Sequence, residues 1–133
     1  MFKLLDHPAD VRLKVSARTL ESLFESAARG LMSLLKPMGE NPAGVREIRL
    51  EAVSREELLV RFLEELIYLV EVKGKFPVRL KVKIDEEEGI CRLQAKVTLR
   101  QGKATREVKA ATYHGLKILQ EPGGYSAAII FDV

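Results

Sequence analysis

The residue types best suited to chemistry lie near the two ends of the sequence. Two acids and a histidine fall within residues 6–10 (Asp-His-Pro-Ala-Asp), and Asp132 follows the apolar run 127–131. The α-carboxylate expected on Val133 would lie beside the Asp132 side chain. Carboxylate oxygens are hard ligands of the kind that Ca²⁺ and Mg²⁺ prefer. Asp10, Asp132 and Val133 could therefore hold a divalent cation if the two ends of the chain meet.

Each of these features also has a simpler structural interpretation. Asp and Pro are common turn residues, so residues 6–10 could form a polar turn. Asp132 could be a solvated side chain at the end of a strand. Three gathered negative charges would repel one another without a cation. Residue types alone leave the metal site and the structural interpretation as open alternatives.

A third group of polar residues occupies the segment 106–115 (REVKAATYHG). Strand alternation would place Glu107, Lys109 and Tyr113 on one face. Such a Glu–Lys pair typically contributes only about 0.2–1 kcal/mol to sheet stability. The pair could equally belong to a charged contact surface or act as acid and base beside a substrate. His114 is expected to be a half-buried strand residue.

Length and composition describe an ordinary globular chain. It has 133 residues, 22 Lys+Arg against 19 Asp+Glu, and 47% hydrophobic residues, which predicts one domain spanning residues 1–133. The single cysteine, Cys91, excludes an internal disulfide framework, and two histidines exclude a Cys/His zinc cluster. We expect Cys91 to be inert packing.

The charge and hydropathy patterns limit the cellular locations in which the protein is expected to act. No apolar run approaches the roughly 20 residues that a membrane helix needs, and the sequence meets charged residues too early for a secretory signal. The sequence thus predicts a cytoplasmic protein with no membrane contact. The net charge of +3 is spread among interleaved acids and bases, so it does not by itself indicate a nucleic-acid-binding protein, and no DNA partner is expected.

Two amphipathic helices are predicted to position these residues. From Leu20 apolar residues recur at three- and four-residue spacing, with Thr19 as N-cap, and Pro37 ends the pattern. A second helix begins at Ser54, whose capping box includes Glu57. Its apolar stripe runs to residue 70, and its predicted solvent side carries Arg55, Arg61, Glu64 and Glu65.

The rest of the sequence alternates with the period of strands. Strands are predicted at residues 11–15, 48–52, 78–85, 90–99, 107–119 and 125–133, after an apolar segment that precedes residue 6. Residues 86–89 and 121–124 are predicted to close two hairpins. The fold class is therefore α+β, a mainly antiparallel β-sheet covered by two amphipathic helices in the order β-β-α-β-α-β-β-β-β.

Four segments in this order resemble the archease family. They are residues 6–11 (DHPADV), 19–24 (TLESLF), 107–116 (EVKAATYHGL) and 130–133 (IFDV). Each segment is unremarkable alone, but all four occur at suitable intervals in a short chain. The resemblance covers essentially all 133 residues.

The resemblance implies a function that composition cannot show. Archeases are non-enzymatic protein cofactors of the RtcB-type tRNA-splicing RNA ligase, which joins a 3′-phosphate or cyclic phosphate end to a 5′-hydroxyl. They promote guanylylation of the ligase's active-site histidine, restore its multiple turnover and broaden its nucleotide use. The chain would reach tRNA, other RNA and GTP indirectly, through the ligase, and would not itself be an enzyme.

The resemblance also implies roles for particular residues. The family binds a divalent metal, often calcium, whose ligands match Asp10, Asp132 and Val133, and Mg²⁺ or Mn²⁺ are alternatives. Glu107 and Lys109 match the family's other important charged residues. Together with His7 they are expected to engage the ligase.

Other functions compete with this one. A general chaperone-like adaptor of RNA-processing or RNA-modifying enzymes would use the same surfaces. A metal-dependent phosphoesterase could be built from Asp6, His7, Asp10 and His114, although no hydrolase motif is present. Direct RNA binding could use Lys103, Arg106 and Lys109.

Overall fold

The computed structural model describes residues 10–133. Within this range the chain forms, in order, β1 (Asp10–Ala17), α1 (Leu20–Leu35), β2 (Pro37–Met38), β3 (Pro42–Ala52), α2 (Arg55–Glu71), β4 (Lys75–Glu87), β5 (Ile90–Gln101), β6 (Lys103–Ala104), β7 (Ala110–Thr112), β8 (Leu119–Glu121) and β9 (Gly124–Asp132). The α+β class is confirmed. The apolar segment predicted before residue 6 lies outside the described residues.

Helix α1 begins and ends where the sequence predicts. Thr19 is the N-cap: its hydroxyl accepts the Ser22 N–H at 3.0 Å, and the Ser22 hydroxyl accepts the Thr19 N–H at 3.2 Å. The helix stops at Lys36, which adopts a left-handed conformation with φ of 45° before Pro37. Side-chain capping thus fixes the start of this helix, and the left-handed backbone of Lys36 followed by a proline fixes its end.

Helix α2 has the predicted N-cap but a different reciprocal contact. The Ser54 hydroxyl accepts the Glu57 N–H at 3.0 Å. The Glu57 carboxylate accepts the N–H of Val53 at 2.9 Å, one residue before the position that a capping box requires. Most of the helix is buried, through Leu58, Leu59, Val60, Phe62, Leu63, Leu66, Ile67, Leu69 and Val70.

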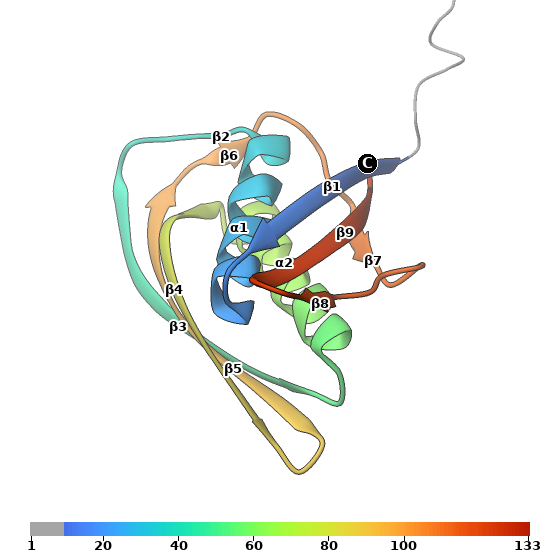
Figure 1. Ribbon diagram of the computed structural model, residues 1–133. Coiled ribbons are helices and arrows are strands. Elements are labelled where there is room, and N and C mark those ends of the chain that lie inside the picture. The colour runs from blue at the N-terminus through green and yellow to red at the C-terminus, as the bar shows by residue number, and fades with distance from the viewer. Residues whose placement is uncertain (1–9) are drawn as a thin grey trace, which may run out of the picture.

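The strands form two larger sheets rather than one. The first, here the β9 sheet, has the order β1-β9-β7 with β8 also paired to β9; the second, the β5 sheet, has the order β3-β5-β4. All of these pairings are antiparallel, and β2 and β6 form a separate short ladder. Helix α1 contacts β1 and β4, and α2 contacts β3, β4 and β7, so the helices lie between the two sheets (Figure 1).

The hydrophobic core occupies the helical layer and the facing sides of both sheets. The rings of Phe24 and Phe62 pack with their centroids 6.0 Å apart, joining α1 to α2. Gly30 of α1 lies directly against the Leu13 side chain of β1, where a Cβ atom would overlap with it. The largest fully buried side chains include Leu31, Leu63, Ile129 and Phe131.

The predicted continuous strand over residues 107–119 is wrong. Only Ala110–Thr112 and Leu119–Glu121 are strands, and both pair with β9. Between them the chain turns, because the Leu116 N–H bonds the Tyr113 carbonyl at 2.9 Å and Gly115 takes a positive φ of 65°. His114 falls in this turn and is exposed, so its predicted half-buried strand position is wrong as well.

The two predicted hairpin turns are confirmed. Glu88 and Gly89 join β4 to β5 with φ values of 51° and 77°. Pro122 and Gly123 join β8 to β9, and Gly123 has a φ of 93°. These are the positions where proline restricts the backbone and glycine allows a positive φ. No helix within residues 10–133 has the length and apolarity needed to span a membrane.

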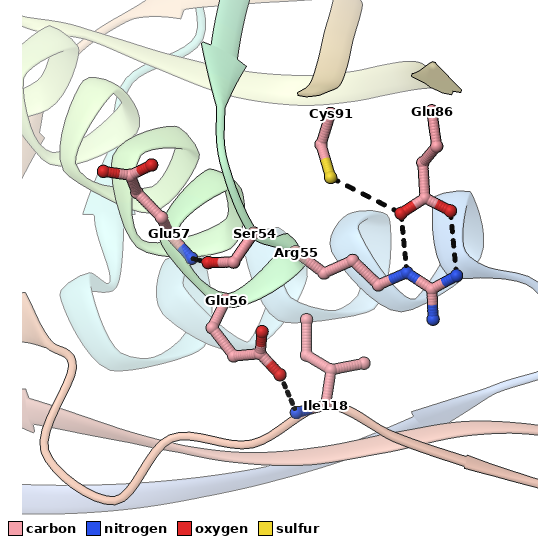
Figure 2. Close-up of polar contacts among 7 residues, drawn as sticks. All are labelled: Ser54, Arg55, Glu56, Glu57, Glu86, Cys91 and Ile118. Atoms are coloured by element: carbon pink, nitrogen blue, oxygen red, sulfur yellow. Dashed lines mark hydrogen bonds and ion pairs between the residues drawn. The ribbon is translucent and has the colours of Figure 1, made fainter. Parts of the chain in front are cut away.

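Three glutamates on the helices bind backbone amides of the sheet layers. Glu25 of α1 accepts the Val82 N–H of β4 at 2.8 Å. Glu64 of α2 accepts the Ala111 N–H of β7 at 3.1 Å. Glu56 of α2 accepts the Ile118 N–H at 2.8 Å, just before β8 (Figure 2). Strands β4 and β7 are edges of their sheets, so these carboxylates satisfy amides that the ladders leave unpaired.

A partly exposed polar cluster connects the start of α2 to the β4–β5 hairpin (Figure 2). The Nε and Nη2 atoms of Arg55 donate to the two carboxylate oxygens of Glu86, both at 2.8 Å. The Cys91 thiol donates to the same carboxylate at 3.4 Å, and the Arg55 guanidinium lies 5.5 Å from the Tyr125 ring centroid. The buried, free Cys91 thus packs as expected but also bonds Glu86.

The ion pair makes stability depend on pH. Hydrogen bonding from Arg55 lowers the pKa of Glu86 below its ordinary 4.5. The stabilisation is complete above that value and is lost as the pH falls through the lowered pKa. We expect E86Q to lower the free energy of unfolding by about 1 kcal/mol at pH 7 because the pair is partly exposed.

Urea denaturation of the wild type and of E86Q at pH 7, 5 and 3 measures this difference. It should shrink as the pH falls. E87Q is the matched control, because Glu87 contributes only a 3.8 Å contact to Arg92 on the same hairpin. An equal difference between wild type and E86Q at all three pH values would contradict the assignment.

Replacing Glu64 with alanine should remove the hydrogen bond that holds the edge strand β7 to α2. E64A leaves the Ala111 N–H without its acceptor, and an unsatisfied buried amide costs about 1–3 kcal/mol. E64Q keeps an acceptor oxygen and removes a charge, and should retain wild-type stability. The rate of amide hydrogen exchange at Ala111 measures whether this hydrogen bond is present. The rate should increase in E64A and stay unchanged in E64Q. Unchanged exchange in E64A would refute the proposed constraint.

Candidate functional site

The ladder between β1 and β9 brings Asp10 and Asp132 together. They are Cα partners at the end of this antiparallel pair, and both side chains are exposed. Directly opposite residues present their side chains on the same face, with Cβ atoms typically about 4.5–5.5 Å apart. The two carboxylates nearest the ends of the sequence therefore share one corner of the β9 sheet.

The other side of Asp132 is occupied by the segment that carries Lys109. Ala110 of β7 is the Cα partner of Asp132, and the Lys109 N–H donates to the Asp132 carbonyl at 2.7 Å. The Lys109 side chain is exposed. Asp10, Asp132 and Lys109 thus lie on three neighbouring segments of the chain, with Asp132 in the middle.

In the part of the chain that the structure describes, no contact ties Glu107 to the corner formed by Asp10 and Asp132 as closely as Lys109 is tied to it. It is exposed and lies in the irregular segment before β7, so the predicted alternation of Glu107 and Lys109 on one strand face does not hold. The intervening Val108 is 1% exposed and anchors the segment in the core. Within residues 10–133 no ion pair links Glu107 to Lys109.

Two predicted site residues cannot be compared with the structure. His7, assigned to ligase activation, lies outside the described residues, as does Asp6 of the alternative phosphoesterase site. Val133 is described, follows β9 directly and is half-buried. Its backbone is thus adjacent to the Asp132 carboxylate.

Glu64 is a neighbour of this corner that the sequence did not reveal. The periodicity placed it on the solvent side of the second helix, but it is half-buried and bonds the Ala111 N–H. Burial raises the pKa of Glu64, the Ala111 N–H opposes this shift, and the negative charge of Asp132 adds to it. The signal available in the sequence was the nearly all-round apolar pattern of α2, which leaves its polar side chains few solvent-facing positions.

The donor chemistry of the corner suits a hard cation. Asp10 and Asp132 supply carboxylate oxygens, and the backbone of Val133 can supply another oxygen. No group of three or more His, Cys, Asp or Glu side chains in residues 10–133 is arranged to hold a metal. A cation held here would thus complete its shell with backbone oxygens or water, which Ca²⁺ and Mg²⁺ both accept.

Comparison with known proteins identifies the family. Residues 2–133 match the model of the archease protein family. The chain is 34% identical over 125 residues to protein archease of Thermococcus kodakarensis, an alignment that covers 90% of this chain and 88% of that protein. It is 33% identical over 141 residues to protein archease of Methanosarcina barkeri, covering 99% of this chain and 95% of that protein.

Solved structures share the fold. The solution structure of Methanobacterium thermoautotrophicum protein 1598 superposes with a TM-score of 0.73 at 28% identity, covering 95% of this chain and 94% of that chain. The crystal structure of an archease, a "possible chaperone", from Thermotoga maritima gives a TM-score of 0.67 at 24% identity, covering 100% and 98%. With a family match over nearly its whole length, the chain belongs to the archease family.

Proposed function

We propose that this archease is a non-enzymatic activator of an RtcB-type tRNA-splicing RNA ligase. It promotes guanylylation of the ligase's active-site histidine, sustains multiple turnover and alters nucleotide specificity. The observation that carries the proposal is the meeting of Asp10, Asp132 and Lys109 at one corner of the β9 sheet in a chain of this family. The protein would act where its ligase acts, in the cytoplasm.

Asp10, Asp132 and an oxygen of Val133 would hold a divalent cation, most suitably Ca²⁺, with Mg²⁺ or Mn²⁺ as alternatives. When bound, the cation supplies the positive charge that offsets two neighbouring carboxylates. The carboxylates in turn fix the beginning of β1 against the end of β9. The residues before Asp10, among them His7, would thereby be held near the same corner.

Lys109 is the residue best placed to act on the partner's nucleotide. Its backbone is bonded to Asp132 and anchored by the buried Val108, while its side chain is free to project. A cation held on a rigid support can orient a triphosphate and stabilise the charge that develops during phosphoryl transfer. Glu107, exposed nearby, would contact the ligase around the same nucleotide.

The exposure of the corner favours activation over catalysis by the chain itself. Asp10, Lys109 and Asp132 are all exposed on the end of a sheet. An enzyme site normally surrounds its substrate and excludes water. A projecting, charged corner instead suits insertion into the active site of another protein.

Metal binding can be measured without the ligase. Titration of Ca²⁺ into the protein should raise its melting temperature, since a ligand at 100 times its Kd stabilises the folded state by about 2.7 kcal/mol. D10N and D132N should lose most of this shift. D85N, which alters an exposed aspartate of the β5 sheet, is the control and should keep it. An equal Ca²⁺ shift in wild type, D10N and D132N would exclude this site, and parallel titrations with Mg²⁺ and Mn²⁺ rank the cations.

Activation is tested by the rate at which purified RtcB-type ligase becomes guanylylated with GTP. Wild-type archease should accelerate the reaction, and D10A or K109A should reduce the acceleration by about tenfold or more, which corresponds to about 1.4 kcal/mol. K117A removes a different exposed lysine and is the control. Full activation by both D10A and K109A would overturn the proposal.

Two further outcomes would favour the competing functions. Recovery of many RNA-modifying enzymes, without the ligase, in a pull-down with the wild-type chain would indicate a general chaperone-like adaptor. Turnover of a phosphodiester by the purified chain alone would indicate an enzyme.

A further inference from the structure

The outer side of the β5 sheet carries a dense set of charged residues. Along its strands buried residues alternate with exposed ones. Ile48, Ala95 and Val82, for example, lie opposite one another on neighbouring strands, and all three are buried on the side that faces the helices. The opposite side is here called the basic face. Its charged members include the cations Arg49, Arg79, Lys81, Lys83, Arg92 and Lys96 and the acids Glu47, Glu51, Asp85 and Glu87.

Two acids of the basic face, Glu47 and Glu51, pair with its arginines rather than with its lysines, whereas Asp85 forms no ion pair within residues 10–133. Arg49 bonds Glu47 at 3.1 Å, and Arg92 bonds Glu51 at 2.9 Å. Among residues 10–133, Lys81, Lys83 and Lys96 form no ion pair. Hydrogen bonds from Gln94 and Arg49, with a smaller effect of Lys96, lower the pKa of Glu47, so this acid is fully ionised at neutral pH and already engaged.

The positions of the three lysines bring like charges close together, which lowers the stability of the sheet. Lys96 of β5 has two Cα partners, Lys81 on β4 and Glu47 on β3, and Lys83 follows Lys81 on the same face. Like charges directly opposite each other destabilise a sheet. Glu47 offsets the charge of Lys96 from the β3 side, but neither Lys81 nor Lys83 has an acid as its Cα partner, so a ligand that supplies negative charge would relieve the repulsion there.

The lysines also share a concave surface. Lys81, Lys83 and Lys96 line a shallow depression of about 530 Å³ together with Val45, Glu47 and Gln94. Neighbouring strands are about 4.8 Å apart and alternate residues on a strand about 6.8 Å apart. The three ammonium groups therefore lie close enough to contact successive phosphates of one backbone, and Gln94 adds a hydrogen-bonding amide between them.

We propose that the basic face binds the sugar-phosphate backbone of RNA. The choice of RNA among polyanions rests on the proposed function, in which the partner ligase acts on RNA. The charged and polar residues of this face include no aromatic side chain on which bases could stack, so binding is directed to phosphate and is independent of base sequence. Because the β5 sheet and the β9 sheet lie on opposite sides of the helices, bound RNA leaves the Asp10–Asp132 corner accessible (Figure 1).

Fluorescence anisotropy with a labelled single-stranded RNA of about 20 nucleotides tests the proposal on the full chain. The variant K81Q/K83Q/K96Q should bind at least tenfold more weakly than wild type. If all three lysines contact phosphates, its slope of log K against log salt should be smaller by about 2, given about 0.7 per phosphate contact on single strands. The control K14Q/K73Q/K117Q removes three exposed lysines elsewhere and should bind like wild type.

Folding and ligase activation provide independent readouts. The K81Q/K83Q/K96Q variant removes a repulsive pair, so it should melt at or above the wild-type temperature. It should also stimulate guanylylation of the ligase in the absence of RNA as well as wild type does, which separates this proposal from the activation proposal. The proposal that the basic face binds RNA would be overturned if K81Q/K83Q/K96Q bound RNA as tightly as wild type, or if the control variant lost as much affinity. Loss of ligase binding with RNA affinity unchanged would assign the face to a protein partner instead.

Discussion

Strand β9 pairs with β1 along one edge and with β7 and β8 along the other, and this arrangement determines where every residue of the candidate site lies. The register of β1 on β9 places Asp10 opposite Asp132, although more than a hundred residues separate them in sequence. The register of β7 on β9 places Lys109 against the Asp132 backbone. Because side chains alternate between faces, a shift of one residue in the β1–β9 ladder would turn Asp10 to the other side of the sheet from Asp132.

The two helices contact both sheets and so hold the β9 sheet in place relative to the β5 sheet. Most of their contact with the sheets is apolar, but three carboxylates of the helices accept backbone amides of the sheet layers, at Val82, Ala111 and Ile118. The pair between Arg55 and Glu86 adds a connection from the start of α2 to the β5 sheet (Figure 2). Each of these contacts is directional, so together they fix the relative position of two sheets that apolar packing alone would constrain less strictly.

The features that the sequence predicted are those set by neighbouring residues. Helix ends at Thr19 and Ser54 and turns at Gly89 and Gly123 follow from capping and from backbone preference, and all four were predicted. Residues 107–119 were misjudged because alternating apolar residues favour a strand, whereas the turn that begins at Tyr113 interrupts the pairing.

Contacts between distant segments were harder to predict. Glu64 was assigned to solvent because its partner, the free amide of an edge strand, is 47 residues away. The pairing of Asp10 with Asp132 was suggested by charge and by family resemblance, but the division of the strands into two sheets was not anticipated. Local pattern specifies each strand and its buried side, and it does not specify which strands share a sheet.

The two sheets give this archease two chemically different surfaces. The corner of the β9 sheet gathers carboxylates beside one projecting lysine, whereas the outer side of the β5 sheet gathers lysines, and two of its acids, Glu47 and Glu51, are bonded to arginines. Both arrangements place like charges side by side, and in both the fold gains nothing from doing so. A cation would relieve the first and a phosphate backbone the second. The two proposed ligands, of opposite charge, would bind on opposite sides of one helical layer in a chain of 133 residues with a net charge of only +3.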